Sequence, residues 1–537
     1  MPAWLGNAVF YEIYPQSFLD TNGDGIGDIC GIIEKLDYIK NLGCNAIWIN
    51  PCFDSPFKDA GYDVRDYRKV AERYGTNDDL VRLFQEAHRR DMHILLDLVP
   101  GHTSEEHPWF LASQKQEENE FSGRYVWTDF CFDRMTGYNY VAGEGERSGT
   151  YLINFFKCQP ALNYGFLHPK HPWQHTPDHP DCRATFEAMV DVMRFWLDKG
   201  CDGFRVDMAS SLVKEDDENH SGTQALWREV RKILDAEYPD AAILAEWGHP
   251  EQSIPGGFHM DFLLNEPGNG YSQLARAYTN KAGRGMLGGP GFNGLPAQEE
   301  IPDESFFVCD SGGDACGFLE HYKELIGVTG GKGYISIITC NHDTVRPAFH
   351  MSPEELILFY GFVFTMPGVP FLYYGDEIGM RYQNLPTKEG GYFRTGSRTP
   401  MQWSDGVNAG FSTGRSEDLY LPVDPSPDAP NVAAQERDPE SLLNRLQRLL
   451  HLRHRTPDLQ ADEPVEILYA KPHDPLLVYR RGSVLIALNV SSGEKECRLK
   501  LSAEGRKTLY RIGGAALSEE GRETLLRLGG QSFVIFG

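Results

Sequence analysis

Short, almost continuously apolar segments alternate with amphipathic segments between residues 10 and 455. Such runs are typical of strands that are buried on both faces of a parallel sheet. Eight of them can be placed, at residues 10–14, 46–50, 93–99, 203–207, 242–246, 260–264, 335–340 and 369–374. The segments between them have the spacing of helices that bury one face. Eight strands alternating with helices predict an α/β fold of the closed (β/α)₈ TIM barrel type.

Two long segments interrupt this alternation. Residues 101–181, between the third and fourth strands, are rich in aromatic residues, Gly, Pro and His and have no clean periodicity. A connection of this length is unusual unless it has a function. We therefore predict an inserted subdomain at 101–181 above the mouth of a barrel formed by residues 1–100 and 182–456. The irregular segment 381–437 is expected to form another wall of the mouth.

The pattern of apolar and polar residues changes near the end of the chain. A last barrel helix is predicted to begin with Asp438 as N-cap and Pro439 as first helical residue. After Pro457, short alternating segments such as VEILYA, LLVYRR, SVLIALNV and QSFVIFG predict strands. Residues 457–537 are therefore expected to form a C-terminal antiparallel β-sandwich domain.

Charge and composition narrow the possible partners. The formal net charge is -26 with no basic block, which disfavours binding to nucleic acid. The N-terminus lacks a basic and apolar leader, and no window approaches ~20 consecutive apolar residues. The eleven cysteines are scattered without a CxxC pair. A cytoplasmic enzyme with no membrane partner and an undetermined oligomeric state is the simplest interpretation.

Charged and polar residues gather at the carboxyl ends of the predicted strands, where barrel enzymes hold their catalytic groups. These residues are Asp97, His102, Arg205, Asp207, Glu246, His342 and Asp343. A single Asp after a strand is more often a turn residue or helix cap, but a cluster of carboxylates requires another explanation. Glycoside hydrolysis uses two carboxyl groups, one that attacks the anomeric carbon and one that protonates the leaving oxygen. Burial and like-charge neighbours can keep the second protonated near neutral pH.

Four motifs in order at these strand ends make the chain recognisable: DLVPGHTS (97–104), GFRVDMASS (203–211), AEWG (245–248) and TCNHDTVR (339–346). With them, the sequence resembles the α-amylase superfamily, glycoside hydrolase family 13. Within this family, its sequence most resembles the branch of α-glucosidases, oligo-1,6-glucosidases and trehalose synthases. Each motif is weak alone, but the four together are specific.

The resemblance implies roles for the catalytic carboxylates. Asp207 matches the nucleophile, Arg205 the arginine that orients and ionises it, and Glu246 the general acid/base. Asp343 matches the third catalytic carboxylate, which grips the sugar 2- and 3-hydroxyls. Asp97 matches an acid that supports the site.

Five further residues are expected to bind the sugar in this resemblance. His102 and His342 match histidines that bond hydroxyls, and Tyr62 matches a tyrosine that stacks on the ring. Asp63 and Arg398 look like a pair that grips the terminal 4-hydroxyl and closes the pocket behind one glucose. The simpler alternatives are hydrogen-bonded core histidines, a packed tyrosine and a structural ion pair.

A metal site is predicted in the loop DTNGDGIGD (20–28). The expected ligands are the side chains of Asp20, Asn22, Asp24 and Asp28 and the carbonyl of Ile26. Oxygen donors at this spacing suit Ca²⁺, although a solvated Gly/Asp turn is the alternative. The same loop binds metal in the oligo-1,6-glucosidase branch, so the resemblance implies one structural calcium and no organic cofactor.

Departures from the family pattern affect specificity. Gly101 stands where many amylases have an asparagine that ligates a second calcium, so a second calcium is not expected. Ser210 and Ser211 replace a frequent Lys-His pair, which indicates a rearranged leaving-group side. Met208 follows the nucleophile where α-1,6-specific members tend to have Val, and this favours α-1,4 bonds.

The predicted function is that of a retaining α-glycoside hydrolase, an α-glucosidase or small amylase, on α-1,4-linked gluco-oligosaccharides. A trehalose synthase or another transglycosylase is the alternative, because it shares the glycosyl-enzyme and differs only in the acceptor. An oligo-1,6-glucosidase and a non-catalytic amylase-like module are further alternatives.

Overall fold

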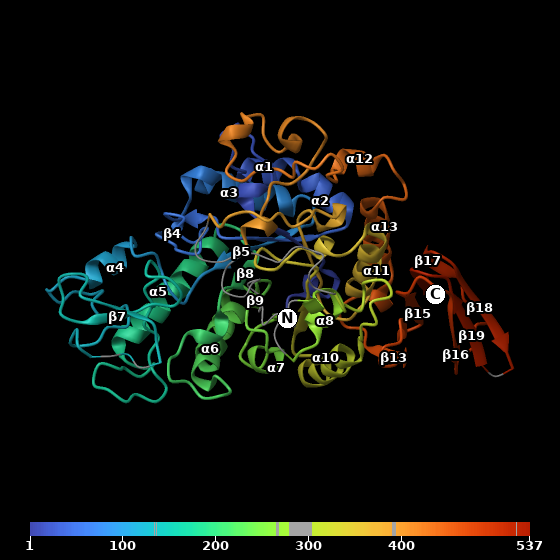
Figure 1. Ribbon diagram of the computed structural model, residues 1–537. Coiled ribbons are helices and arrows are strands. Elements are labelled where there is room, and N and C mark those ends of the chain that lie inside the picture. The colour runs from blue at the N-terminus through green and yellow to red at the C-terminus, as the bar shows by residue number, and fades with distance from the viewer. Residues whose placement is uncertain (134, 136, 265–267, 279–302, 389–393, 522) are drawn as a thin grey trace.

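A parallel β-barrel forms the centre of the computed structural model (Figure 1). The structure describes residues 1–133, 135, 137–264, 268–278, 303–388, 394–521 and 523–537. In the described chain the barrel strands are β1 (Phe10–Ile13), β2 (Ala46–Ile49), β5 (His93–Leu98), β8 (Gly203–Val206), β9 (Ala242–Ala245), β10 (Met260–Leu263), β11 (Tyr334–Ile337) and β12 (Phe371–Tyr373). Each lies within or beside a predicted segment, so the predicted barrel is confirmed.

The strand order is β11-β10-β9-β8-β5-β2-β1-β12, and all the pairings are parallel. A further parallel bridge joins Ile338 to Phe371 and brings the two edges of the sheet together. Aromatic rings fill the interior. Phe371 stacks on Phe10 with ring centroids 4.3 Å apart and meets Phe262 edge-on at 5.0 Å.

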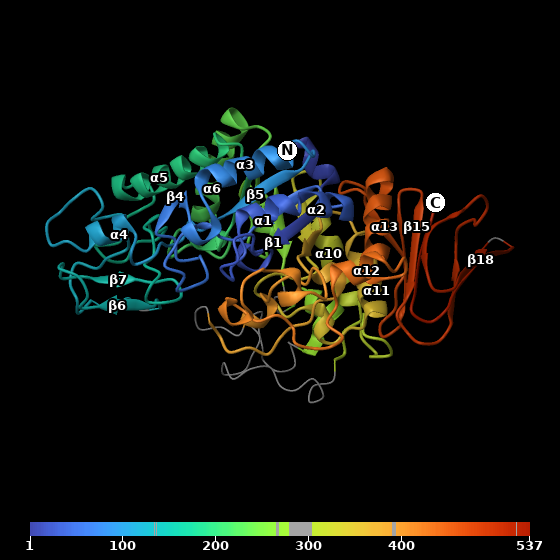
Figure 2. The same ribbon diagram turned by 90° about the horizontal axis from the view of Figure 1, so that it is seen from above.

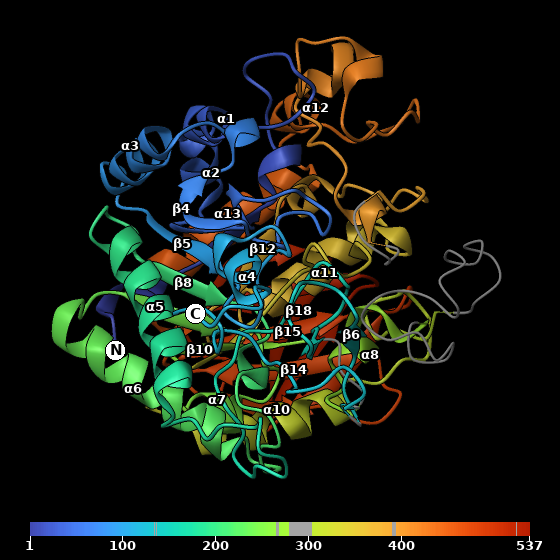
Figure 3. The ribbon, with the colours of Figure 1, turned by 90° about the vertical axis from the view of Figure 1, so that its left-hand side faces the viewer.

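Helices surround the strands, as Figure 3 shows. In chain order they are α1 (Ile29–Glu34), α2 (Leu36–Leu42), α3 (Asn77–His88), α5 (Pro180–Leu197), α6 (Ser221–Glu237), α7 (Pro250–Ser253), α8 (Tyr271–Ala275), α10 (Cys316–Thr329), α11 (Pro353–Val363), α12 (Val432–Glu436) and α13 (Leu442–Arg455). Helix α3 illustrates why they form: Thr76 and Asp79 make a reciprocal capping box, and Leu80, Leu83 and Phe84 are buried. None of the described helices is both long and apolar enough to cross a membrane.

The start of α13 corrects one sequence prediction. The helix begins at Leu442, and its N-cap is Ser441, whose hydroxyl accepts a hydrogen bond from the Asn444 amide at 3.2 Å. Asp438 instead accepts the amide of Glu440 in the preceding turn, at 2.9 Å. Both are good capping residues, and burial of Leu442 next to the cap accompanies the later start.

The segment between β5 and β8 projects from the barrel, opposite the C-terminal domain, in both Figure 1 and Figure 2. It contains α4 (Pro108–Ser113), β6 (Tyr140–Ala142) and β7 (Thr150–Leu152). It has a small apolar core of its own, with Val126, Met135, Leu152, Ala161 and Phe166. A short hairpin, β3 (Phe53–Asp54) and β4 (Asp66–Val70), follows β2.

Two antiparallel sheets follow α13. One has the order β13-β14-β15-β20-β17 and the other β16-β19-β18. Their strands are β13 (Val465–Tyr469), β14 (Leu476–Arg481), β15 (Val484–Asn489), β16 (Lys495–Leu499), β17 (Thr508–Ile512), β18 (Ala515–Glu520), β19 (Glu523–Leu528) and β20 (Ser532–Phe536). Apolar side chains of both sheets form one buried cluster between them. Strands β16 to β19 were not among the predicted strands.

Candidate active site

Two carboxyl groups share one guanidinium at the mouth of the barrel. Asp207 follows β8, and Glu246 follows β9. The hydrogen bonds of the parallel sheet extend to both residues: the Asp207 amide donates to Leu98 O, and the Glu246 amide donates to Val206 O. Arg205 Nη1 lies 3.1 Å from Asp207 Oδ1, and its Nη2 lies 2.9 Å from Glu246 Oε1. The Met208 amide donates to Glu246 Oε2 at 3.0 Å. The two predicted catalytic groups are therefore adjacent and fixed.

The pKa of Asp207 depends on burial and on charged neighbours of both signs. Asp207 and Glu246 are both buried, with 7% of each residue exposed. Burial first and the Glu246 carboxylate second raise the pKa of Asp207, against the opposing charge of Arg205. Arg205 is therefore the neighbour that favours the ionised form of Asp207, which the role of nucleophile requires.

Asp97 supports the pair from β5. Its Oδ1 accepts a hydrogen bond from Arg205 Nη1 at 2.8 Å, and its Oδ2 accepts one from Trp48 Nε1 at 3.1 Å. Burial raises the pKa of Asp97 to about 6, while Arg205 opposes the shift. Arg205 is thus held by three carboxyl groups, which fixes the guanidinium that positions Asp207.

A second charged group surrounds Asp343, which follows β11. Asp343 Oδ1 accepts hydrogen bonds from Arg398 Nη2 at 2.7 Å and from Arg394 Nη1 at 2.9 Å. Burial alone would raise the pKa of Asp343, but Arg394 and its other cationic neighbours hold it well below the usual value. Asp343 is therefore an anion at every working pH and lies at the centre of an arginine clamp.

His342 connects the two groups. Its Nε2 lies 2.6 Å from the Tyr62 hydroxyl, and its Nδ1 lies 2.8 Å from Glu12 Oε1. Burial lowers the pKa of His342 far below 6.5, so the ring is neutral. The Tyr62 ring stacks on His342 with centroids 5.4 Å apart, and its hydroxyl also donates to Asp97 at 3.1 Å. Sugar stacking by Tyr62 and hydroxyl bonding by His342 remain predictions.

His102 follows β5 and is buried. Its Nε2 lies 3.0 Å from the Tyr62 carbonyl, and its Nδ1 lies 3.0 Å from the Asn154 side-chain amide. Burial lowers the pKa of His102 to about 4. Both ring nitrogens thus contact protein atoms, and a direct bond from His102 to a sugar hydroxyl stays a prediction.

The expected pairing of Asp63 with Arg398 is wrong. Asp63 turns into its own loop, where Oδ1 accepts hydrogen bonds from Ser55 Oγ and the Asp59 amide, and Oδ2 accepts one from the Lys58 amide, each at 3.0 Å. Closing this turn uses the whole carboxylate. Arg398 instead donates to the His342 carbonyl at 2.9 Å and to Asp343.

The pair that the structure does form is Asp59 with Arg394. Arg394 Nη2 is hydrogen-bonded to Asp59 Oδ1 while its Nη1 binds Asp343, and Gln159 donates to Asp59 Oδ2 at 2.7 Å. Asp59 and Arg394 are both buried. Asp59 and Asp63 both belong to the stretch DAGYD (59–63), and nothing in the sequence indicated that the first, rather than the second, pairs with an arginine bound to Asp343.

A hollow of about 520 Å³ begins at Met208, the residue that follows Asp207. Its lining includes Met208, Ser210, Ser211, Lys214 and Asn154. Lys214 is buried, its ammonium donates to the Ser211 carbonyl, and burial lowers the pKa of Lys214 to about 8. This hollow lies next to Glu246, because Met208 donates its amide to that residue.

The loop 20–28 offers oxygen donors from one short turn. Asp20 accepts the amides of Gly23 and Gly25 at 2.7 Å each, and Asn22 bonds Asp24 at 3.1 Å. Within the described residues, the ion pairs do not involve the loop carboxylates of Asp20, Asp24 and Asp28, so no basic side chain neutralises them. The three carboxylates do not converge within 4.8 Å. The donor chemistry fits Ca²⁺, and the calcium stays a prediction.

Paired carboxyl groups at the carboxyl end of a (β/α)₈ barrel are characteristic of enzymes that cleave glycosidic bonds, and this arrangement assigns the protein to that class. Comparison with known families agrees with the assignment. The family described as "Alpha amylase, catalytic domain" matches residues 12–260 and 317–462. The chain belongs to the α-amylase family, as its four motifs predicted.

Named relatives include both transferring and hydrolysing enzymes. The chain is 34% identical to the trehalose synthase/amylase of Mycobacterium tuberculosis, over 85% of this chain and 76% of the relative. It is 32% identical to the oligo-1,6-glucosidase of Heyndrickxia coagulans, over 91% of this chain and 93% of the relative. A solved structure of an isomaltulose synthase variant of Erwinia rhapontici NX5 in complex with D-glucose matches with a TM-score of 0.79 and 26% identity, over 100% of this chain and 99% of that chain.

Proposed function

We propose that the protein is a retaining transglucosylase that converts maltose, an α-1,4-linked disaccharide, into trehalose, its α,α-1,1-linked isomer. The observation that carries the proposal is the buried ion-pair chain Asp59–Arg394–Asp343–Arg398. Charged side chains linked in this way would close the pocket beyond a single glucose and bond that sugar's terminal hydroxyls. A chain could then enter only by its terminal glucose, and a disaccharide such as maltose is the shortest substrate that meets this condition.

The chemistry follows from the two adjacent carboxyl groups. Asp207 attacks the anomeric carbon of the bound glucose while Glu246 gives its proton to the leaving glycosidic oxygen, so the bond to the second sugar breaks as the bond to Asp207 forms. Glu246 then takes a proton from the 1-hydroxyl of the released glucose, which attacks the same carbon and frees Asp207. Two inversions give net retention, and no proton is gained or lost overall.

For transfer to occur instead of hydrolysis, the released glucose must remain bound and turn its 1-hydroxyl towards the glycosyl-enzyme before water reacts with that intermediate. The 520 Å³ hollow beside Glu246 has room for a second sugar, and its polar lining from Ser210, Ser211 and Asn154 suits hydroxyl groups. The named trehalose synthase/amylase relative supports this alternative over simple hydrolysis of α-1,4 bonds, which the sequence alone favoured.

Incubation of the pure enzyme with maltose tests the proposal. We expect trehalose to be the main product by NMR, with glucose as a minor product and an approach to the same mixture from trehalose. The Asp207→Asn variant, matched in shape, should give neither sugar. Glucose alone as product would replace the proposal with an α-glucosidase, and rapid cleavage of isomaltose would indicate an oligo-1,6-glucosidase.

We also propose one structural calcium in loop 20–28, bound by Asp20, Asn22, Asp24, the Ile26 carbonyl and Asp28. The support is the set of hard oxygen donors in one turn. The loop packs on residues 412–420, since Ser412 donates to Asp20 at 2.6 Å and the Tyr420 amide bonds Gly25 O at 3.0 Å. A cation there would stabilise the junction between the first loop and the wall at 381–437.

A further inference from the structure

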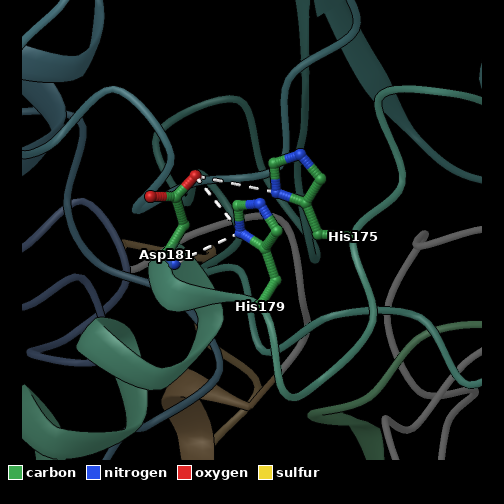
Figure 4. Close-up of side chains that lie close together, drawn as sticks. All are labelled: His175, His179 and Asp181. Atoms are coloured by element: carbon green, nitrogen blue, oxygen red, sulfur yellow. Dashed lines mark hydrogen bonds and ion pairs between the residues drawn. The ribbon is translucent and has the colours of Figure 1, made fainter.

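Three potential metal ligands lie together far from the catalytic carboxylates in the sequence, where the inserted segment returns to the barrel (Figure 4). They are His175, His179 and Asp181, at the start of α5. Their ligand atoms all lie within 4.8 Å of one another, and this is the only such group of His, Cys, Asp and Glu among the described residues. The catalytic roles and the loop 20–28 use none of them.

Both histidines of the cluster lie at the same distance from one carboxylate oxygen. Nδ1 of His175 and Nδ1 of His179 each lie 3.6 Å from the same oxygen, Asp181 Oδ2. This is longer than a hydrogen bond but close to the separation of about 3.4 Å between two ligands of a tetrahedral ion with bonds near 2.05 Å. The imidazole rings are stacked, with centroids 3.6 Å apart and planes at 22°, so binding one ion through both nitrogens requires the two rings to tilt apart.

The hydrogen bonding of the ligand atoms leaves room for a cation. Nδ1 of His175 is buried and accepts no hydrogen bond within the described chain. Nδ1 of His179 has only the 3.3 Å contact from the Asp181 amide at the helix cap, which coordination would replace. In the described chain, the ion pairs of Asp181 are with these two histidines, so no arginine or lysine competes for its carboxylate.

The surroundings hold the carboxylate in place. A Cβ on Gly123 would lie 2.0 Å from Asp181 Oδ2, so the backbone at this glycine presses directly against the carboxylate. Only a residue without a side chain permits this approach. The sequence adds an independent sign, since four of the chain's 17 histidines occur within residues 168–179, and short His-rich tracts commonly bind metal.

We propose that His175, His179 and Asp181 bind one zinc ion through two imidazole nitrogens and one carboxylate oxygen, with water as the fourth ligand. Two nitrogens and one oxygen suit zinc better than the all-oxygen shell of calcium. The role is structural. The segment ending at this cluster is bonded to the hollow beside the catalytic pair, because the Leu167 amide bonds Lys214 O and the Lys214 amide bonds Gly165 O, both at 2.9 Å. Zinc would tie this segment to the first turn of α5.

The test measures zinc binding directly, and it does not depend on which reaction the enzyme catalyses. Protein without an affinity tag is stripped with dipicolinate, kept in excess calcium to occupy oxygen-rich sites, and titrated with Zn²⁺ by calorimetry and elemental analysis. The variants are His175→Asn and Asp181→Asn. The matched control is His168→Asn, which removes an exposed histidine of the same segment. Circular dichroism verifies that each variant is folded.

We expect one zinc per chain in the wild type and in His168→Asn, and a dissociation constant raised about 10-fold or more in His175→Asn and Asp181→Asn. Zinc should also raise the melting temperature of the wild type and not that of these two variants. Cobalt in place of zinc should give the intense visible absorption of a tetrahedral site only where all three ligands are present. Equal zinc affinity in all four proteins, or less than one equivalent in the wild type, would overturn the proposal.

Discussion

The guanidinium of Arg394 forms a buried ion pair with the carboxylate of Asp59, 335 positions earlier in the chain. Through its other nitrogen, Arg394 also binds Asp343. The ion pair of Asp59 with Arg394 is therefore continuous with one of the three predicted catalytic carboxylates. A substitution at Asp59 should therefore also disturb Asp343. An ion pair with a purely structural role would have no such effect on a predicted catalytic carboxylate.

We predict that Asp59→Asn lowers kcat/KM on maltose by roughly 2–4 kcal/mol of transition-state binding, because a buried, charge-assisted partner of Arg394 is lost. Steady-state kinetics on maltose gives the value. The wild type should also fail to cleave a maltoheptaoside blocked at its non-reducing end. Rapid cleavage of that substrate would mean an open, endo-acting cleft.

Asp63→Asn is the comparison variant for this prediction. It weakens the turn at 55–59, so its melting temperature should fall while its kcat/KM stays near that of the wild type. If Asp63→Asn loses as much kcat/KM as Asp59→Asn without melting earlier, then Asp63 rather than Asp59 binds the substrate.

The contrast between these aspartates shows what the sequence could and could not predict. Burial on both faces makes the barrel strands recognisable as apolar runs, and the barrel then brings Asp207 and Glu246 together because parallel strands end on one rim. Which carboxylate of the DAGYD stretch faces the site is decided by hydrogen bonds within the turn and by Arg394, far away in the chain. Strand pattern contains no information on either.

The C-terminal domain also contains strands that could be predicted from the sequence and strands that could not. VLIALN at 484–489 is buried throughout and was predicted. AALSEE at 515–520 ends in three consecutive exposed polar residues, two of them glutamates, so its apolar content is too low for a prediction from pattern. It forms a strand because β19 offers it an edge and an apolar face.

We predict that Asp207→Asn and Glu246→Gln both lower kcat on maltose, by about 10²–10⁴-fold for the acid/base and at least as much for the nucleophile. The two variants should differ on an aryl glucoside, whose leaving group needs no proton. Glu246→Gln should still form the glycosyl-enzyme and accumulate it, visible as added mass on the intact protein. Asp207→Asn should not. A mass adduct on Asp207→Asn would place the nucleophile elsewhere.

The buried ammonium of Lys214 predicts a pH dependence of stability. Burial lowers the pKa of Lys214 from 10.5 to about 8, so between these values the unfolded chain binds more protons than the folded one. Stability therefore rises with pH across that window, and the full cost of the buried charge is present below pH 8. Lys214→Met should raise the free energy of unfolding by roughly 2–4 kcal/mol at pH 7 and by less at pH 10.

Urea unfolding at pH 7 and pH 10 measures this difference. Other groups also titrate in this range, so the quantity to compare is the variant minus the wild type. Lys232→Met, at an exposed position of α6, is the matched control and should show little change at either pH. A Lys214→Met protein that is less stable than the wild type at pH 7 would show that the ammonium has a compensating partner.

Calcium in loop 20–28 should stabilise the protein without taking part in the chemistry. An ion that binds only the folded loop adds about 2.7 kcal/mol at a concentration 100 times its dissociation constant, so EGTA should lower the melting temperature while kcat on maltose measured at 25 °C is unchanged. Asp24→Ala removes an exposed ligand and should melt at the same temperature with and without calcium. Asp240→Asn, at an exposed aspartate outside the loop, should keep the full calcium effect. If calcium shifts the melting of Asp24→Ala as much as that of the wild type, the loop is a Gly/Asp turn held by its own hydrogen bonds, such as those from Gly23 and Gly25 to Asp20.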